Sequence, residues 1–270
     1  AYTAPISLGS PLAVTVHDVS FSRHPEWFRF PERNRRHILT RLTARRAAVV
    51  LTVSEFSRSE ISALYGLPRD RVRVIPNGLS PRLAQGPVAR EPLILYAGSI
   101  FNRRRLPDLI AAFAVVLRSV PAAQLVIAGD NRTWPPQDLA AVAAAHGVTG
   151  KVALRQYVSD GELAQLYARA SVFAYLSEYE GFGLTPLEAL AAGVPVVLLD
   201  TPVAREVHGD AGRFVPRGDI EGTAAAIVEL LTVRSAALEQ LSRATGVLAR
   251  YSWEAAADRT LAAIEGIAQL

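Results

Sequence analysis

The chain has 270 residues, half of them apolar and 20% charged, with a net charge of +4 and an isoelectric point near 9.7. It contains no cysteine, which excludes disulfide bonds and thiolate chemistry, and it has no apolar run of the ~20 residues that a transmembrane helix needs. A cytoplasmic enzyme fits these features, although missing cysteines alone do not exclude secretion, and the chain is long enough for two domains. The charge alone does not choose among nucleic acid, anionic lipid and phosphorylated small molecules as partners.

The first part of the chain alternates strands and helices, but sparsely. Only three strands are predicted there, whereas a doubly wound domain has about six. Because methionine is also absent, even at position 1, we expect a fragment or a processed chain whose N-terminal domain is partial. The predicted elements are a strand at 11–18, an Arg-rich helix at 32–47, a strand at 48–54, a helix that Ser57 caps and Gly66 ends, and a short strand at 71–78.

From residue 93 onward, short apolar strands alternate regularly with helices. This alternation predicts an α/β fold with a parallel sheet and helices on both faces, a Rossmann-like domain. The predicted strands are 93–98, 124–129, 151–156, 171–177 and 194–199. The predicted helices are 107–120, 135–147, one that the Ser159 capping box opens, 185–193, 219–233 and an amphipathic helix at 251–270.

The stretch EYEGFGLTPLEALAAGVPVV at 179–198 places a glycine-rich turn between a predicted strand and a predicted helix. Ligands of open parallel sheets bind beyond the carboxyl ends of the strands, which is where this turn lies. Gly181 and Gly183 would allow the backbone to approach a ligand closely, and the helix start behind them suits a phosphate group. Thr185 is the predicted N-cap of that helix.

Two glutamates flank this turn, and each has an alternative interpretation. Glu188 could complete a capping box in TPLE and so only satisfy the N-cap amide, and this alternative has about even weight on the sequence. Glu180 lies outside the helix, before the glycines, where a side chain faces the ligand crevice. A lone glutamate in a loop is usually only solvated.

This stretch resembles the E-x7-E signature of the retaining glycosyltransferases of family 4, which have the GT-B fold of two facing Rossmann-like domains. Other stretches match the family in the expected order, so the resemblance covers nearly the whole chain. They are TVHDVSF, TVSEFSRSEI, VRVIPNG, YAGSIFNRRRLPDLIAAF, LVIAG, QYVSDGELAQLYARA and AGRFVP.

The resemblance implies a domain organisation. Residues 1–83 would form a partial, acceptor-side N-terminal domain, and residues 84–251 would form the C-terminal domain that binds a nucleotide sugar. The Pro-rich stretch 81–92 is the predicted linker. The helix at 252–270 would pack back on the N-terminal domain through Trp253, Leu261 and Ile264.

The resemblance also implies roles for the residues of the turn. Glu180 would hydrogen-bond a hydroxyl of the donor sugar, and Glu188 would reach the ribose of the nucleotide. The backbone N–H groups around the turn would hold sugar hydroxyls and phosphate. The implied binding set is Gly181, Phe182, Gly183, Leu184 and Thr185, with Val158 of QYVSD.

The basic segment NRRRLPD at 102–108 follows the first strand of the C-terminal domain. It could be a solvated turn, or a clamp on the diphosphate leaving group, whose developing charge a fixed cation stabilises. The family places an arginine and a lysine here, and these positions hold Ser99 and Arg104. Since Ser99 departs from the pattern, we expect Arg103 or Arg105 to supply the second charge, unless stabilisation of the leaving group is weaker.

His17 ends a predicted strand at its carboxyl end, where a histidine can face the crevice, although a lone histidine is more often structural. In the family the matching histidine lies near the donor sugar and helps to orient it. The resemblance implies a reaction on one face of the sugar, assisted by the leaving phosphate, with no metal and no cofactor.

The Arg-rich helix at 32–47 is by default a solvated face with an apolar stripe of Ile38, Leu39 and Leu42; the alternative is docking on anionic lipid at the inner face of the membrane. Nucleic-acid binding has little support, because no basic platform interleaved with aromatic residues is found.

The leading hypothesis is a hexosyltransferase that uses GDP-mannose or UDP-glucose, with an unknown acceptor for which lipid-linked and polysaccharide acceptors are the candidates. A nucleotide-sugar-binding module without turnover is the alternative. An epimerase is disfavoured by the E-x7-E context. A partial N-terminal sheet also predicts self-association through residues 1–80.

Overall fold

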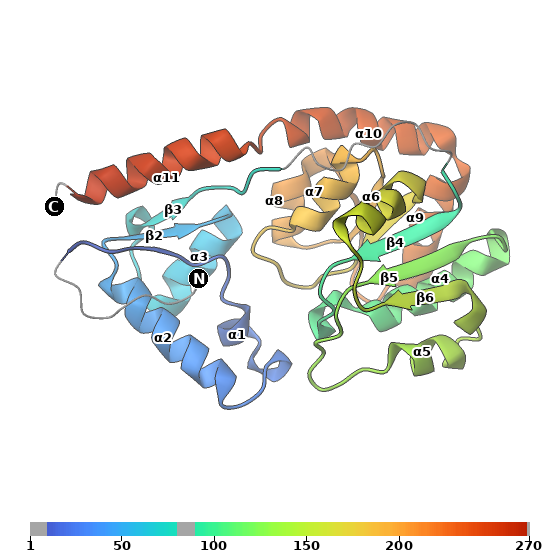
Figure 1. Ribbon diagram of the computed structural model, residues 1–270, viewed down its shortest axis with the longest axis horizontal. Coiled ribbons are helices and arrows are strands. Elements are labelled where there is room, and N and C mark those ends of the chain that lie inside the picture. The colour runs from blue at the N-terminus through green and yellow to red at the C-terminus, as the bar shows by residue number, and fades with distance from the viewer. Residues whose placement is uncertain (1–9, 80–89, 269–270) are drawn as a thin grey trace. The chain divides into compact units, whose positions relative to one another are not determined.

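The computed structural model describes residues 10–79 and 90–268 and divides the chain into two compact units (Figure 1). The short segment Tyr179–Phe182 belongs to unit 1, although the chain on both sides of it belongs to unit 2. Most of the predicted linker at 81–92 lies outside the described residues. Unit 1 comprises Ala1–Leu79, Tyr179–Phe182 and Arg250–Leu270, and unit 2 comprises Ser80–Glu178 and Gly183–Ala249.

Unit 1 is built on a parallel sheet whose three strands, in the order β1–β2–β3, come from its described residues. The central strand β2 is buried along its whole length, as expected for a strand covered on both faces. The elements are β1 (Ala13–Thr15), α1 (Ser20–Arg23), α2 (Glu32–Arg46), β2 (Val49–Thr52), α3 (Glu55–Tyr65), β3 (Val72–Val74) and α11 (Trp253–Ala268), with 3₁₀ turns at Pro25–Trp27 and Arg69–Arg71.

Helix α3 begins three residues earlier than the sequence predicted. Ser54, not Ser57, is the N-cap, and its side-chain oxygen accepts a hydrogen bond from the Ser57 N–H at 3.0 Å. The predicted end is confirmed, because Gly66 adopts a left-handed conformation with φ of 66°. The early start frees the Ser57 hydroxyl for other contacts.

The faces that α11 and α2 bury differ from those predicted. On α11, Ala263 and Ile267 pack against Val49 and Leu51 of β2, whereas the predicted contact residues Trp253, Leu261 and Ile264 are about half exposed. On α2 the buried residues are Thr40, Thr43 and Ala44, and the predicted apolar stripe leaves Ile38 and Leu42 exposed.

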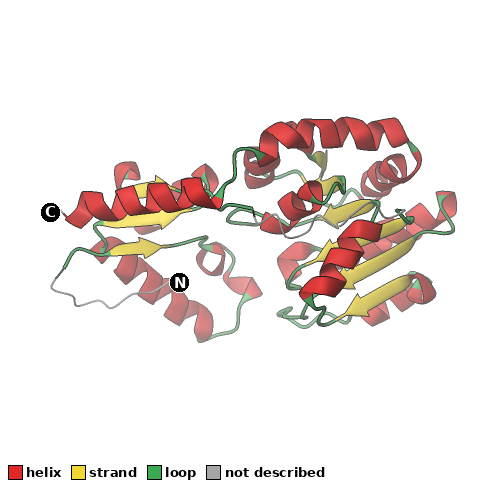
Figure 2. Ribbon diagram, turned by 45° about the horizontal axis from the view of Figure 1, so that its top comes forward, coloured by secondary structure: helices red, strands yellow, loops and turns green. Residues whose placement is uncertain are grey.

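Unit 2 holds a parallel six-stranded sheet in the order β6–β5–β4–β7–β8–β9, and Figure 2 shows its strands flanked by helices. The strand order reverses between β4 and β7, the point of an open α/β sheet where ligands bind. The elements are β4 (Leu93–Ala97), α4 (Leu106–Ser119), β5 (Gln124–Ala128), α5 (Leu139–Ala145), β6 (Val152–Arg155), α6 (Asp160–Arg169), β7 (Val172–Tyr175), α7 (Leu184–Ala191), β8 (Val196–Leu199), α8 (Pro202–His208), β9 (Arg213–Val215), α9 (Ile220–Thr232) and α10 (Arg234–Leu248).

The predicted strands of unit 2 are all present, and the capping box of Ser159 and Glu162 at the start of α6 is confirmed. Helix α5 begins at Leu139, later than predicted, because Asp138 caps it. Three elements of this unit were not predicted from the sequence, namely α8, β9 and α10. Within residues 10–79 and 90–268, no helix is both long and apolar enough to span a bilayer.

Candidate functional site

Arg104 lies at the reversal point of the unit 2 sheet, in a 3₁₀ turn that follows β4. Its side chain is only 8% exposed. One guanidinium nitrogen, Nη1, donates hydrogen bonds to the hydroxyl of Tyr175 and, at 3.2 Å, to the Oγ of Ser177. The guanidinium carbon also lies 4.6 Å from the centroid of the Tyr175 ring. The end of β7 therefore fixes this cation in place.

The neighbouring arginines have different surroundings. Arg105 is paired with Asp108 and Glu178, at 2.7 Å between its Nε and the Asp108 Oδ2. Burial opposes its charge, but the hydrogen bonds to both carboxylates raise the pKa of Arg105. The two carboxylates therefore already neutralise Arg105. Arg103 is 8% exposed, and its guanidinium carbon lies 4.4 Å from the centroid of the Phe101 ring.

Helix α7 starts at a glycine rather than at the threonine predicted. Gly183 is the N-cap, with φ of 90°, and no side chain caps the helix. The Thr185 hydroxyl is buried and has no hydrogen-bond partner among the described residues. Because Leu184 is the first helical residue, Glu188 is too far along the helix for the predicted capping box, and that alternative is wrong.

Glu188 is half-buried on the first turns of α7, and burial raises the pKa of its carboxyl group. Its carboxylate makes no hydrogen bond or ion pair with the residues that the structure describes. An acid kept half-buried without a partner costs free energy in the unliganded fold. Such a group is more common in binding sites than on ordinary surfaces.

Gly183 also has a buried neighbour that sequence reasoning missed. A β-carbon on Gly183 would lie 3.5 Å from the Cε1 of His208, which is 2% exposed at the end of α8. The His208 Nδ1 lies 3.1 Å from the Ala204 carbonyl, which can only accept, so Nδ1 carries a proton. The sequence signal was a histidine in an unassigned helix.

In unit 1 the structure brings His17 and the glycine-rich turn together. A β-carbon on Gly181 would stand 2.4 Å from the His17 carbonyl oxygen, so only glycine fits there. Glu180, the residue before Gly181, is thereby held near the end of β1. Burial lowers the pKa of the His17 imidazole, which therefore stays neutral to lower pH than a free histidine.

The remaining predicted residues play smaller parts in the geometry. The Phe182 side chain is buried and packs edge-on against Tyr251 of unit 1, with ring centroids 5.1 Å apart. Ser99 is half-buried after β4, and its carbonyl accepts a hydrogen bond from the Tyr96 hydroxyl at 3.0 Å. Val158 is half-buried in the loop between β6 and α6.

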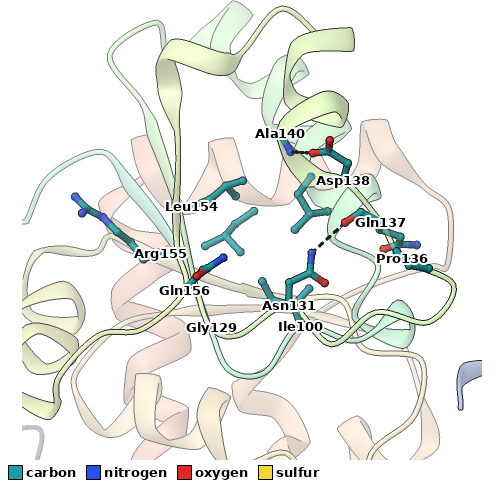
Figure 3. A pocket seen from close by; sticks show the side chains of 12 residues that line it. Ile100, Gly129, Asn131, Pro136, Gln137, Asp138, Ala140, Leu154, Arg155 and Gln156 are labelled. Carbon is teal, nitrogen blue, oxygen red and sulfur yellow. Dashed lines mark hydrogen bonds between the residues drawn. The ribbon is translucent and has the colours of Figure 1, made fainter. Parts of the chain in front are cut away.

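A cavity of about 370 Å³ opens beside these loops in unit 2, and none of the predicted residues lines it (Figure 3). Its walls are mainly apolar, with Ile100, Ile127, Leu139 and Leu154, and Asn131 and Gln156 add amide groups at its rim. Ile100 stands on the loop that carries the arginines. The described residues contain no group of three or more His, Cys, Asp or Glu that could hold a metal ion.

The profile of the family described as "Glycosyl transferases group 1" matches residues 83–245, and that of "Glycosyltransferase Family 4" matches residues 1–83. O-antigen chain mannosyltransferase B of Escherichia coli is 31% identical over 264 residues, covering 92% of this chain and 68% of the relative. GDP-mannose:cellobiosyl-diphosphopolyprenol alpha-mannosyltransferase of Xanthomonas campestris is also 31% identical, over 94% of this chain and 67% of the relative. The chain thus spans about two thirds of their length.

Solved structures agree on the fold. The crystal structure of HepE from Anabaena in complex with UDP and glucose superposes with a TM-score of 0.80, at 20% identity, over 95% of this chain and 72% of that one. At this identity the likeness concerns the fold alone. Each of the two units is an α/β unit with a parallel sheet. Together with this structural neighbour, that arrangement assigns the chain to the GT-B fold class.

Proposed function

The chain belongs to the glycosyltransferases of group 1, and from this premise we propose that it transfers a hexose from a nucleotide-diphosphate sugar to a hydroxyl acceptor with retention of configuration. The observation that carries the proposal is the buried Arg104, which two side chains of the β7 end hold at the reversal point of the sheet. A cation fixed in this way, with little water around it, suits the diphosphate of such a donor.

The diphosphate would lie between this cation and the start of α7. The first N–H groups of a helix have no partner within the helix, and α7 has no side-chain cap that could satisfy them. Arg103 would add the charge that Ser99 does not provide. When the bond between sugar and phosphate breaks, these groups would stabilise the negative charge that develops on the leaving diphosphate.

The nucleoside would occupy the neighbouring part of unit 2. The apolar cavity fits a flat ring, and the loop from Ile100 to Arg104 joins it to the phosphate position. Val158 would border the ring from the loop after β6. The half-buried carboxylate of Glu188 would accept a hydrogen bond from the ribose, which explains why it is kept without a protein partner.

Two of the predicted residues would act at the sugar of the donor. Glu180 would bind a sugar hydroxyl, and neutral His17 would help to orient the ring. In the reaction the acceptor oxygen bonds to the anomeric carbon on the face that the phosphate leaves, and the acceptor proton passes to a phosphate oxygen. This scheme assigns no protein nucleophile, metal or cofactor.

The donor and the acceptor that we propose are taken from the names of the relatives. One relative is named for GDP-mannose, and the HepE structure contains UDP and glucose, so GDP-mannose leads and UDP-glucose is second. Lipid-linked or polysaccharide acceptors match the names of the mannosyltransferase relatives. Such acceptors favour a cytoplasmic location at the inner membrane face, where the exposed Ile38 and Leu42 of the Arg-rich α2 would contact anionic lipid.

A nucleotide-sugar-binding module without turnover is the alternative, because the residues proposed to hold the nucleotide all lie in unit 2. We also propose that the chain self-associates through unit 1. Light scattering at rising protein concentration tests this self-association. A monomer at all concentrations, with full turnover, would contradict both.

A thermal-shift panel of GDP, UDP, GDP-mannose, UDP-glucose and the free nucleosides tests the proposed function. A ligand at a hundred times its Kd stabilises the folded state by about 2.7 kcal/mol, which such an assay detects. We expect one diphosphate and its sugar to stabilise the protein and the nucleosides to have little effect. No shift with any diphosphate would overturn the proposal. A shift without sugar release or transfer would favour the binding module.

A further inference from the structure

Two buried serine hydroxyls of unit 1 converge on one carbonyl oxygen of the glycine-rich turn. The Oγ of Ser54 donates a hydrogen bond to the Gly181 carbonyl at 2.7 Å, and the Oγ of Ser57 lies 3.3 Å from the same oxygen. The Ser57 Oγ also donates to the His17 carbonyl at 3.0 Å. Both serines are at most 1% exposed, so water does not compete for these groups.

The two hydroxyls make different sets of hydrogen bonds. The Ser54 oxygen also accepts the Ser57 N–H as the N-cap of α3, so removing it would disturb the helix as well. The Ser57 hydroxyl has one hydrogen, which it shares between the carbonyls of His17 and Gly181. The two carbonyl oxygens therefore lie near each other in a buried place, where they repel each other. The hydrogen that they share offsets this repulsion. Ser57 therefore joins the end of β1 to the turn.

The residue on the other side of Glu180 is also fixed in unit 1. The Tyr179 ring meets the rings of His24 and Phe56 edge-on, with centroids 5.3 and 5.4 Å apart. Burial raises the pKa of the Tyr179 hydroxyl, which stays protonated. Glu180 thus lies between an aromatic anchor and a hydrogen-bonded glycine, and its backbone has little freedom.

We propose that Ser57 is a positioning residue, whose hydroxyl holds the Glu180 segment against the end of β1 so that Glu180 and His17 keep a fixed mutual position. The kinetic part of this inference rests on the proposed function, in which both residues act at the donor sugar. A misplacement of such groups by about 1 Å can lower a rate ~100-fold. Ser57 itself touches no substrate in this scheme.

The first experiment needs no ligand. Hydrogen exchange of the peptide that spans residues 177–184 is compared in wild type, Ser57→Ala, Ser57→Thr and the control Ser59→Ala, whose serine is exposed on the same helix. We expect Ser57→Ala to speed exchange in this peptide by ~10-fold or more, through local opening, while the peptides of β2 are unchanged. Ser57→Thr keeps the hydroxyl and should restore protection. Unchanged exchange in Ser57→Ala would overturn the positioning role.

The second experiment separates positioning from general structure. Calorimetry measures Kd for GDP and for GDP-mannose, and likewise for UDP and UDP-glucose, and transfer assays measure kcat and KM where turnover is found. We expect Ser57→Ala to leave the affinity for the nucleoside diphosphate within about twofold and to reduce the extra affinity that the sugar provides. We also expect the decrease in kcat to exceed any change in KM by ~10- to 100-fold. A merely structural defect would weaken both ligands together.

The two experiments fail in different ways. If wild type binds none of these ligands, the proposed function is wrong, and the exchange measurement still decides whether Ser57 holds the turn. If wild type binds them and Ser57→Ala retains both the sugar contribution and kcat, Ser57 has no positioning role in the reaction.

Discussion

The backbone of Gly129, after β5, passes so close to Gly98, after β4, that a β-carbon on Gly129 would stand 1.9 Å from the Gly98 carbonyl oxygen. Both glycines also have positive φ, 153° at Gly129 and 137° at Gly98. The loops that carry the arginines and line the cavity are therefore in backbone contact. No side chain fits at this point.

Gly129→Ala should accordingly destabilise the protein by about 3 kcal/mol or more, since the alanine would have both a strained backbone and a backbone clash. Chemical denaturation measures the loss. Gly150→Ala is the control, because a β-carbon there meets nothing within 4 Å. Equal stability of the two variants would show that these loops separate easily.

Glu180→Gln should lower transfer by ~100-fold or more, because a neutral amide binds a sugar hydroxyl more weakly in the transition state. The affinity for nucleoside diphosphate should stay within about twofold. Kinetics and calorimetry measure the two quantities, with exposed Glu265→Gln as the control. Unchanged turnover would remove Glu180 from the mechanism.

Arg104→Ala should weaken nucleoside diphosphate binding by ~10- to 100-fold, the range expected for a lost hydrogen bond between charged groups. Nucleoside binding should change little, because the cation would contact only phosphate. Arg103→Ala tests whether its neighbour supplies the second charge, and exposed Arg118→Ala is the control. Equal losses for nucleoside and diphosphate in calorimetry would contradict the clamp.

Because of Glu188, the free energy of unfolding should fall as the pH rises above 4.5, the ordinary pKa of a glutamate. The folded state has the raised pKa and keeps the proton to higher pH than the unfolded state, so deprotonation favours unfolding in this window. Glu188→Gln should therefore melt higher than wild type at pH 7, with the difference vanishing below pH 4.5, and should bind the nucleotide more weakly. A lower melting temperature at pH 7 would mean that the carboxylate has a stabilising partner.

Replacing Ile38 and Leu42 of α2 by serine should reduce binding to phosphatidylglycerol vesicles while leaving the melting temperature nearly unchanged, since both side chains are exposed. Arg35→Ala and Arg41→Ala should weaken binding further, by about 1 kcal/mol for each charge near the anionic surface. Co-sedimentation measures the effect, with neutral vesicles as the control. Equal binding of the wild type and the serine variant to these vesicles would refute the proposal that α2 docks on anionic lipid.

Local signals in the sequence were sufficient where all the interacting groups lie within a few residues. The capping box of Ser159 needs only Glu162, three positions on, and it forms as predicted. Gly66 ends α3 because its left-handed conformation depends on the residue itself. The alternation of strands and helices likewise predicted the parallel α/β fold and placed the arginines and the glycine-rich turn at strand ends.

Distant parts of the chain decided which face of a helix is buried. The sequence predicted Trp253, Leu261 and Ile264 as the contact face of α11. In the structure, Val49 and Leu51, some two hundred residues earlier in the printed sequence, instead pack against the face with Ala263 and Ile267.

The sequence by itself determined the fold class, the family resemblance and the residue types of the site. Only the tertiary structure decided which of those residues meet. The hydrogen bond from Ser54 to Gly181 spans 127 positions, and it assigns the Glu180 segment to unit 1 while Glu188 stays in unit 2. No local pattern encodes such a contact, because its free energy arises only when both segments are buried together and water is excluded from the shared carbonyl.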